Sequence, residues 1–249
     1  MSGWIARGLR RGILTTRYPD GPFEMPERYR GRLCVRQGAS RDDCARGAEA
    51  CLSRAIVLGE EASHVRIERC FQCGECRRRA PDAFDLTNDY EVACVEGDVA
   101  AVRERLRARL ASLGKSIFLR HVDAGSDASC DQELQALFNP FYDVSRLGIF
   151  LSAAPRHADV LAVTGVVTRS MADPLLRTYQ AMPDPKVVIA VGSAAASGSI
   201  FETGPSILGP VDQVIPVDVK VPGAPPPPVA ILHGLWVALG RIAAPQAAS

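Results

Sequence analysis

The chain has 249 residues, which is long enough for two compact domains or for one domain with an added module. Its 29 basic and 28 acidic residues give a formal charge of +1, so the overall charge offers no attraction to nucleic acid or to another polyanion. Eight cysteines without a signal sequence indicate a reducing compartment, where clustered cysteines bind metal more often than they form disulfides. The most apolar stretch, residues 229–239, is too short to cross a bilayer, so we expect no transmembrane span.

Residues 1–33 are predicted to form an N-terminal arm. Within its first eleven residues, Trp4, Ile5 and Leu9 occur among arginines and no acidic residue is present, a pattern typical of an amphipathic helix. Such an arm packs on a partner or lies on the headgroup surface of a membrane. A frayed chain end is the alternative, since termini are often poorly ordered.

Residues 34–100 contain two runs with the cysteine spacing of a two-cluster ferredoxin, and each run is incomplete. The second run follows the pattern C-x2-C-x2-C-x3-C-P, with Cys70, Cys73 and Cys76 at its first three positions and Ala80 at the fourth. The first run is more degraded, and on the same spacing its four positions are Arg41, Cys44, Gly47 and Cys51. These residues are predicted to form a small α+β ferredoxin-like module.

Ligand losses must be counted across the two runs, because the fourth cysteine of each run binds the cluster of the other run. One set is then complete and consists of Cys51, Cys70, Cys73 and Cys76. The other set has one thiol in four positions, which are Arg41, Cys44, Gly47 and Ala80. The sequence therefore predicts one [4Fe-4S] cluster and one vacated site. A structural zinc ion on the same four thiolates is the alternative, since zinc also accepts four cysteines.

From residue 115 to residue 249 short apolar runs alternate with helical patterns. The expected strands are residues 116–122, 147–152, 158–163, 186–191 and 213–217, and the expected helices are residues 132–138, 171–182 and 229–242. This order predicts an α/β domain with a doubly wound, flavodoxin-like parallel sheet, preceded by the smaller module. The linker between them is expected at residues 101–114, whose arginine-rich residues 102–110 indicate a solvated helix.

Several blocks of this region resemble one family. They are residues 123–133, 139–140, 155–165, 168–172 and 217–223, and residues 12–19 and 26–31 add to the likeness. In this order they are similar to the small iron-sulfur subunit of membrane-bound, formate-hydrogenlyase-type [NiFe] hydrogenases, which is related to the B subunit of respiratory complex I. The resemblance covers nearly the whole chain.

In that family the sheet domain binds a proximal [4Fe-4S] cluster through four cysteines in loops that follow strands. The corresponding positions here are Asp127, Cys130, Ala194 and Ala224, of which only one is a cysteine. Alanine has no donor atom, so the resemblance implies that this second site is also vacated. We therefore expect no cluster in the sheet domain.

The resemblance implies that the chain is a subunit of a membrane-associated, hydrogenase-like or complex-I-like oxidoreductase. The partners of the chain would be a large subunit and membrane ion-transport subunits, which would hold the chain on the cytoplasmic face of the cell membrane. No nucleophile, acid and base set is present that would make the chain catalytic by itself. With the proximal relay lost, a largely scaffolding role is slightly preferred. Active electron transfer and an independent ferredoxin-like binding protein are the alternatives.

Overall fold

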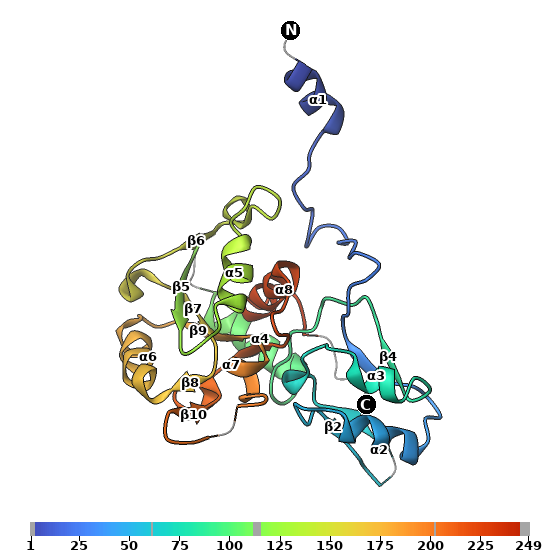
Figure 1. Ribbon diagram of the computed structural model, residues 1–249. Coiled ribbons are helices and arrows are strands. Elements are labelled where there is room, and N and C mark those ends of the chain that lie inside the picture. The colour runs from blue at the N-terminus through green and yellow to red at the C-terminus, as the bar shows by residue number, and fades with distance from the viewer. Residues whose placement is uncertain (1–2, 61, 112–115, 202, 245–249) are drawn as a thin grey trace.

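A computed structural model describes residues 3–60, 62–111, 116–201 and 203–244. Its larger part is built on a five-stranded parallel sheet, shown in Figure 1. The strands of this sheet are β5 (Ile117–Asp123), β6 (Ile149–Leu151), β7 (Val160–Thr164), β9 (Val187–Val191) and β11 (Val219–Val221). They lie in the order β11-β9-β7-β5-β6. Numbered along the chain this is the order 2-1-3-4-5 of flavodoxin-like folds, which confirms the predicted doubly wound sheet.

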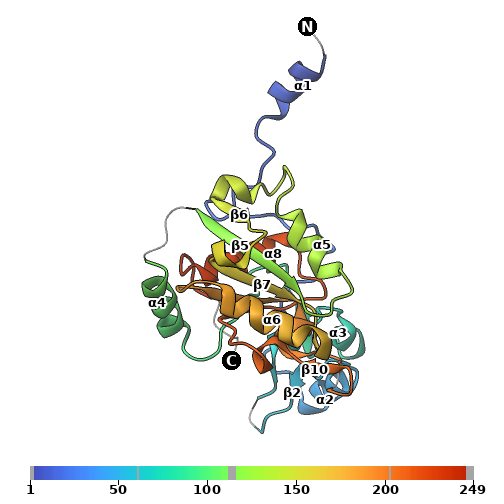
Figure 2. The same ribbon diagram turned by 90° about the vertical axis from the view of Figure 1, so that its left-hand side faces the viewer.

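Helices cover both faces of the sheet, as Figures 1 and 2 show. One face carries α4 (Val99–Arg109), α5 (Ser129–Ala136) and α8 (Pro228–Ala238), and the other carries α6 (Arg169–Ala181) and the short α7 (Ser193–Ser197). Val187 and Ile189 of β9 pack toward the first layer, and Val188 and Ala190 pack toward the second. All five residues of β7 and of β9 are buried, which explains why these strands are continuous apolar runs.

The prediction of a strand at residues 213–217 was wrong. The fifth strand is β11, and the preceding apolar residues Val214 and Ile215 pack under the sheet as irregular chain after the short 3-10 helix η4 (Val211–Gln213). The strand itself contains Lys220, whose ammonium group is buried and paired with Glu96 and Asp212. A lysine in a three-residue strand hides the apolar pattern that a buried strand usually shows.

Two helices also differ from their predictions. Helix α4 forms where expected but is not solvated all round, because Val102, Leu106 and Leu110 are buried on the face toward α8. Helix α8 is buried at every residue and ends at Ala238, before the positive φ of Gly240. Residues 112–114 of the predicted linker lie outside the described residues.

The smaller part of the chain is an α+β unit with its own core. Its elements are β1 (Leu33–Val35), α2 (Arg41–Glu49), β2 (Ile56–Val57), β3 (His64–Val65), the 3-10 helix η1 (Ile67–Arg69), α3 (Glu75–Arg79) and β4 (Phe84–Leu86). Strand β1 pairs with β4 and β2 pairs with β3, both antiparallel. The unit is joined to the sheet domain by a short antiparallel bridge between Cys94 and Lys220 of β11.

The remaining elements lie around this frame. They are the antiparallel pair β8 (Val167–Thr168) and β10 (Ile207–Gly209), and the 3-10 helices η2 (Val144–Leu147) and η3 (Pro155–His157). Helix α1 (Gly3–Arg11) has no buried residue and projects away from the body of the molecule, as Figures 1 and 2 show.

Candidate functional site

Four cysteines of the small unit are brought together by the packing of α2 against α3. Cys51 follows the end of α2, and Cys76 lies in α3. Cys70 and Cys73 lie in the loop between η1 and α3. Cys70 and Cys76 are buried, whereas Cys73 is exposed, so the group lies at the surface of the unit's core. These are the four residues that spacing alone had assigned to one site.

The loop between Cys70 and Cys76 turns sharply because two of its residues have left-handed backbones. Gln72 has φ +60° and Gly74 has φ +77°. The turn directs the Gln72 N–H toward Cys70 Sγ at 3.3 Å, and the Ala55 N–H donates to Cys51 Sγ at 3.3 Å. Backbone donors directed at sulfur favour the thiolate over the thiol, which is the form that binds metal.

The electrostatics of the four cysteines fit a group that supplies positive charge. Burial raises the pKa of Cys70 to about 12, the Gln72 N–H opposes this, and the neighbouring thiolates of Cys51, Cys73 and Cys76 raise the pKa further. Burial likewise raises the pKa of Cys76 to about 11. Four close thiolates are therefore unfavourable by themselves, and cations between them would remove the penalty.

Two further observations bear on this group. The Gln72 Nε2 amide is buried beside the cysteines and has no hydrogen-bond partner, so a donor remains to be satisfied. Within the described part of the chain, no three or more His, Cys, Asp or Glu side chains are arranged to hold a metal ion. In a cubane each cysteine binds its own iron, whereas the four ligands of zinc all lie about 2.3 Å from one ion.

An aromatic ring occupies the space beside Gly47, one of the four positions predicted for the incomplete set. A Cβ atom added to Gly47 would lie 2.2 Å from Cε2 of Phe84, a ring that is fully buried. Cys44 and Ala80 belong to the same buried cluster as this ring, while Arg41 is exposed at the start of α2. Three of the four residues of the incomplete set are thus part of a packed core.

The third position lies at the carboxyl edge of the parallel sheet and forms a pocket of about 240 Å³. Loops that follow β5, β7, β9 and β11 line it, at the point where the strand order reverses between β5 and β7. Such a switch point is where open α/β sheets place ligands. All four residues that the resemblance had assigned to the proximal cluster line this pocket, namely Asp127, Cys130, Ala194 and Ala224.

The polar side chains of the pocket are already engaged. The Asp127 carboxylate accepts hydrogen bonds from the hydroxyl and the backbone N–H of Ser129, which hold the pKa of Asp127 below its usual value. Burial raises the pKa of Cys130 to about 11, so this thiol is protonated at neutral pH. At the four positions the pocket therefore has the protonated thiol of Cys130, the carboxylate of Asp127, which is already hydrogen-bonded to Ser129, and two alanines.

A buried serine joins the cysteine group to the pocket, and sequence reasoning had not found this contact. Ser193 lines the pocket, and its hydroxyl donates to the carbonyl oxygen of Cys70 at 2.8 Å. The same hydroxyl accepts the Gly223 N–H at 2.9 Å. Phe71, which directly follows Cys70, also lines the pocket. The sequence separation of 123 positions between Cys70 and Ser193 leaves no local signal from which this pairing could be inferred.

A second polar group that sequence reasoning had not found lies behind the pocket. His121 Nε2 is 2.9 Å from Thr164 Oγ1 and 3.1 Å from Asp131 Oδ1. Ser126, which lines the pocket, donates to the other oxygen of Asp131 at 2.8 Å. Burial holds the pKa of His121 below its ordinary value, although the Asp131 carboxylate opposes this effect. These bonds fasten the first turn of α5 to the ends of β5 and β7.

The chain is similar to proteins of known family. A model of the family described as NADH ubiquinone oxidoreductase, 20 Kd subunit, matches residues 128–238. The probable membrane-bound hydrogenase subunit mbhJ of Pyrococcus furiosus is 46% identical over 145 residues, which are 57% of this chain and 87% of that protein. Formate hydrogenlyase subunit 7 of Escherichia coli is 40% identical over 148 residues, which are 59% of this chain and 57% of that protein.

Among solved structures, a chain of the membrane-bound sulfane sulfur reductase, an archaeal respiratory membrane complex, is 29% identical with a TM-score of 0.45 and covers 56% of this chain and 76% of that chain. In the described residues no helix is both long enough and apolar enough to cross a membrane. With 46% identity over most of the length of the P. furiosus subunit, the chain belongs to the family of the NADH ubiquinone oxidoreductase 20 Kd subunit.

Proposed function

We propose that this chain is an iron-sulfur subunit of a membrane-associated, hydrogenase-like oxidoreductase complex. In this proposal it binds one [4Fe-4S] cluster through Cys51, Cys70, Cys73 and Cys76 and lacks the proximal cluster of the sheet domain. Its role is largely that of a scaffold. Two relatives named as subunits of a membrane-bound hydrogenase and of formate hydrogenlyase support the assignment to such a complex.

The single observation that carries the cluster assignment is the convergence of four free cysteines from two separate runs. The order strand, helix, strand, strand, helix, strand of the small unit is that of ferredoxin-like modules, which supports iron over zinc. A bound cluster would supply a one-electron redox centre at this place. The residues of the chain would hold it with four thiolates and with N–H donors aimed at two of the sulfurs.

The absence of a proximal cluster is proposed because the pocket at the sheet edge offers one cysteine where four ligands are needed. A soft-metal cluster requires thiolates, and neither alanine nor the committed carboxylate of Asp127 can replace them. Electrons from the remaining cluster would lack the usual next carrier. This is why scaffolding, between a large subunit and membrane ion-transport subunits, is placed ahead of electron transfer.

A peripheral position on the cytoplasmic face of the membrane, held by these partners, belongs to the same proposal. Active electron transfer is the second candidate. It is favoured by the direct hydrogen bond between Ser193 of the pocket and the backbone of Cys70, which keeps the proposed cluster close to the sheet edge. A partner that brings its own redox group to this edge would complete the path. Reduction of the cluster by the substrate of the assembled complex would select this candidate over scaffolding.

The cluster assignment is tested by anaerobic purification of the chain together with its partner subunits, followed by iron, acid-labile sulfide and electron paramagnetic resonance measurements. We expect about four irons and about four sulfides per chain and one reduced-state signal. About eight irons would contradict the single cluster, and zinc without sulfide would contradict the redox assignment.

A matched pair of cysteine variants makes this test specific. Cys51→Ser removes a proposed ligand and should abolish the paramagnetic signal and most of the bound iron. Cys44→Ser changes a buried cysteine of the same core that belongs to the incomplete set, and it should leave the iron content unchanged. Equal iron loss in both variants would mean that the assignment of ligands is wrong.

A further inference from the structure

Helix α1 is an amphipathic helix without a partner in the described structure. All its residues are exposed, including Trp4 at 69% and Leu9 at 81%. Ile5 and Leu9, four residues apart, lie on one side of the helix, whereas Trp4 precedes Arg7 by three residues and Arg11 by seven and so lies on the side of the arginines. Arg7, Arg10 and Arg11 lie three and four residues apart on the other side. Burying an exposed apolar face of this kind against another surface lowers the free energy of the system.

The charge of this segment differs from that of the rest of the chain. Residues 1–19 contain four arginines and no acidic residue, whereas the remaining residues carry 25 basic and 28 acidic side chains. The apolar surface continues past the helix with Ile13, 81% exposed, and Leu14, 61% exposed. An occupant of this surface must therefore accept aromatic and aliphatic side chains and also provide negative charge.

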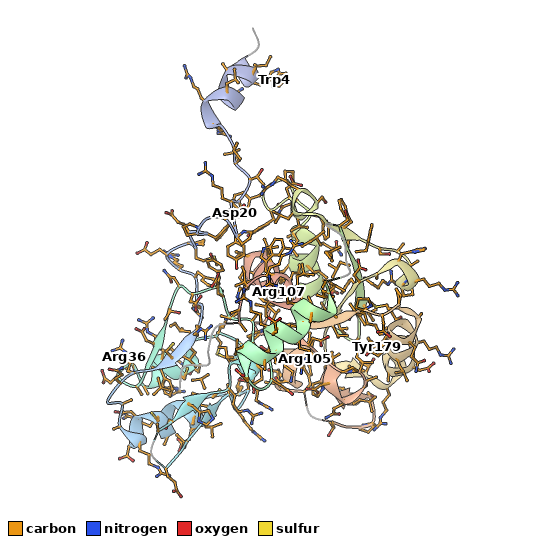
Figure 3. All side chains as sticks on the ribbon, turned by 180° about the vertical axis from the view of Figure 1, so that it is seen from behind. Trp4, Asp20, Arg36, Arg105, Arg107 and Tyr179 are labelled. Atoms are coloured by element: carbon orange, nitrogen blue, oxygen red, sulfur yellow. The ribbon has the colours of Figure 1, made fainter. Side chains whose placement is uncertain are left out.

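The segment is tethered to the body just beyond these residues. The Thr16 N–H donates to the carbonyl oxygen of Phe141 at 2.8 Å, and the Arg146 guanidinium donates to the Thr16 carbonyl oxygen at 2.8 Å. Figure 3 shows Trp4 at the tip of the projecting helix, on the far side of the molecule's body from Arg36. The helix thus projects outward from a segment that is held to the body by the hydrogen bonds of Thr16.

We propose that α1 lies in the interface of an anionic lipid bilayer and contacts the headgroups directly. Its nine residues span only about 14 Å, so the helix lies along the surface and does not cross the bilayer. Ile5 and Leu9 enter the boundary of the acyl chains, Trp4 lies at the level of the headgroups, and the arginines pair with anionic headgroups. This proposal is independent of the cluster, because α1 makes no contact with the four cysteines.

A lipid surface fits these side chains better than a protein groove. A groove requires anchors at matched spacing on one narrow stripe, whereas here a tryptophan is at the start of the helix and aliphatic residues continue beyond its end. A nine-residue helix is also only marginally stable in water, and Gly3 and Gly8 weaken it further. Insertion into an interface would stabilise the helical form.

The test is co-sedimentation of the purified full-length chain with vesicles of phosphatidylcholine alone and of phosphatidylcholine mixed with phosphatidylglycerol. We expect binding to the anionic vesicles that falls steeply when salt is raised from about 0.1 M to about 1 M. Trp4 also gives an optical signal, since Trp236, the other tryptophan, is buried. Its fluorescence should shift to shorter wavelength on anionic vesicles only.

Variants separate the contribution of charge from that of apolar contact. Replacing Arg7, Arg10 and Arg11 with glutamine should weaken binding about a hundredfold, at about fivefold for each arginine. Trp4→Ala with Leu9→Ala should weaken it by about tenfold or more. The control for charge replaces three exposed arginines of the body, Arg28, Arg105 and Arg156, with glutamine and should change binding by less than about twofold.

Two further variants test the geometry. Gly8→Ala places a methyl group in open space and should tighten binding by about threefold or more, because it favours the helix. Trp4→Phe should retain binding and lose the fluorescence shift. Equal binding to neutral vesicles, or no effect of the arginine substitutions, would overturn the proposal. Binding that requires the membrane subunits and is independent of lipid charge would overturn it in favour of a protein partner.

Discussion

The cysteine group of the small unit and the pocket at the sheet edge lie side by side, joined by the hydroxyl of Ser193, yet they differ in what they retain. The cysteine group has four thiols, those of Cys51, Cys70, Cys73 and Cys76. The pocket keeps its shape and one thiol. A third region, around Gly47, has one thiol, that of Cys44, but the Phe84 ring fills the space beside Gly47.

Under the proposed function, the difference shows why one vacated cluster site keeps its shape and another does not. The walls of the pocket are loops at the ends of four parallel strands, whose positions are determined by the hydrogen bonds of the sheet. Replacing a cysteine there with alanine removes a donor atom but leaves the backbone in place. Around Gly47 the wall is made of side chains, and side chains repack into empty space.

The largest effect is expected from restoring thiols to the pocket. The triple variant Asp127→Cys, Ala194→Cys and Ala224→Cys completes a set of four with Cys130. If the strand ends still provide the geometry, the iron content should rise from about four to about eight per chain after anaerobic reconstitution, with a second paramagnetic signal. Such a result would remove the chemical difference between the two regions.

The control for this experiment is the same triple variant with Cys130→Ser, which leaves three thiols and should remain near about four irons per chain. Both variants must show the circular dichroism of the unaltered protein. A folded triple variant that gains no iron would mean that the pocket has lost the geometry of a cluster site as well as its ligands.

A smaller effect is expected from crowding the filled position. Gly47→Ala places a methyl group against the Phe84 ring and should lower the free energy of unfolding by about 1–3 kcal/mol. Urea denaturation measures this. The control is Gly204→Ala, whose methyl group would lie in open space and should change the free energy of unfolding by less than about 0.5 kcal/mol. Adding Phe84→Leu should recover part of the loss in Gly47→Ala, and a neutral Gly47→Ala would show that the ring does not fill this site.

The smallest effect is expected at the contact between the two regions. Ser193→Ala leaves the Gly223 N–H and the Cys70 carbonyl without this partner and should cost about 1–2 kcal/mol of stability. It should also speed the loss of iron to a chelator, because the cysteine loop is less firmly held. The control is Ser197→Ala, which removes the hydrogen bond from the Ser197 hydroxyl to the Ser193 carbonyl oxygen within α7. It should leave the rate of iron loss unchanged.

Sequence reasoning predicted most of the sheet domain. The apolar runs at β7 and β9 are buried on both faces, so their side chains had to be apolar throughout. Sequence reasoning failed at β11, where Lys220 is buried because Glu96 and Asp212 from other segments form ion pairs with it. It also failed at α4, where the apolar residues of the buried face are interspersed with arginines. In both places a distant contact overrode the local pattern.

By itself, the sequence determined which side chains occupy the three sets of cluster positions and in which order strands and helices follow each other, because both depend on residue type and spacing along the chain. Only the tertiary structure decided that Phe84 fills the space beside Gly47, that Asp127, Cys130, Ala194 and Ala224 surround one open pocket, and that Ser193 holds the loop of Cys70. Each of these depends on close packing and hydrogen bonding between segments far apart in the chain, which leave no periodic signal in the sequence.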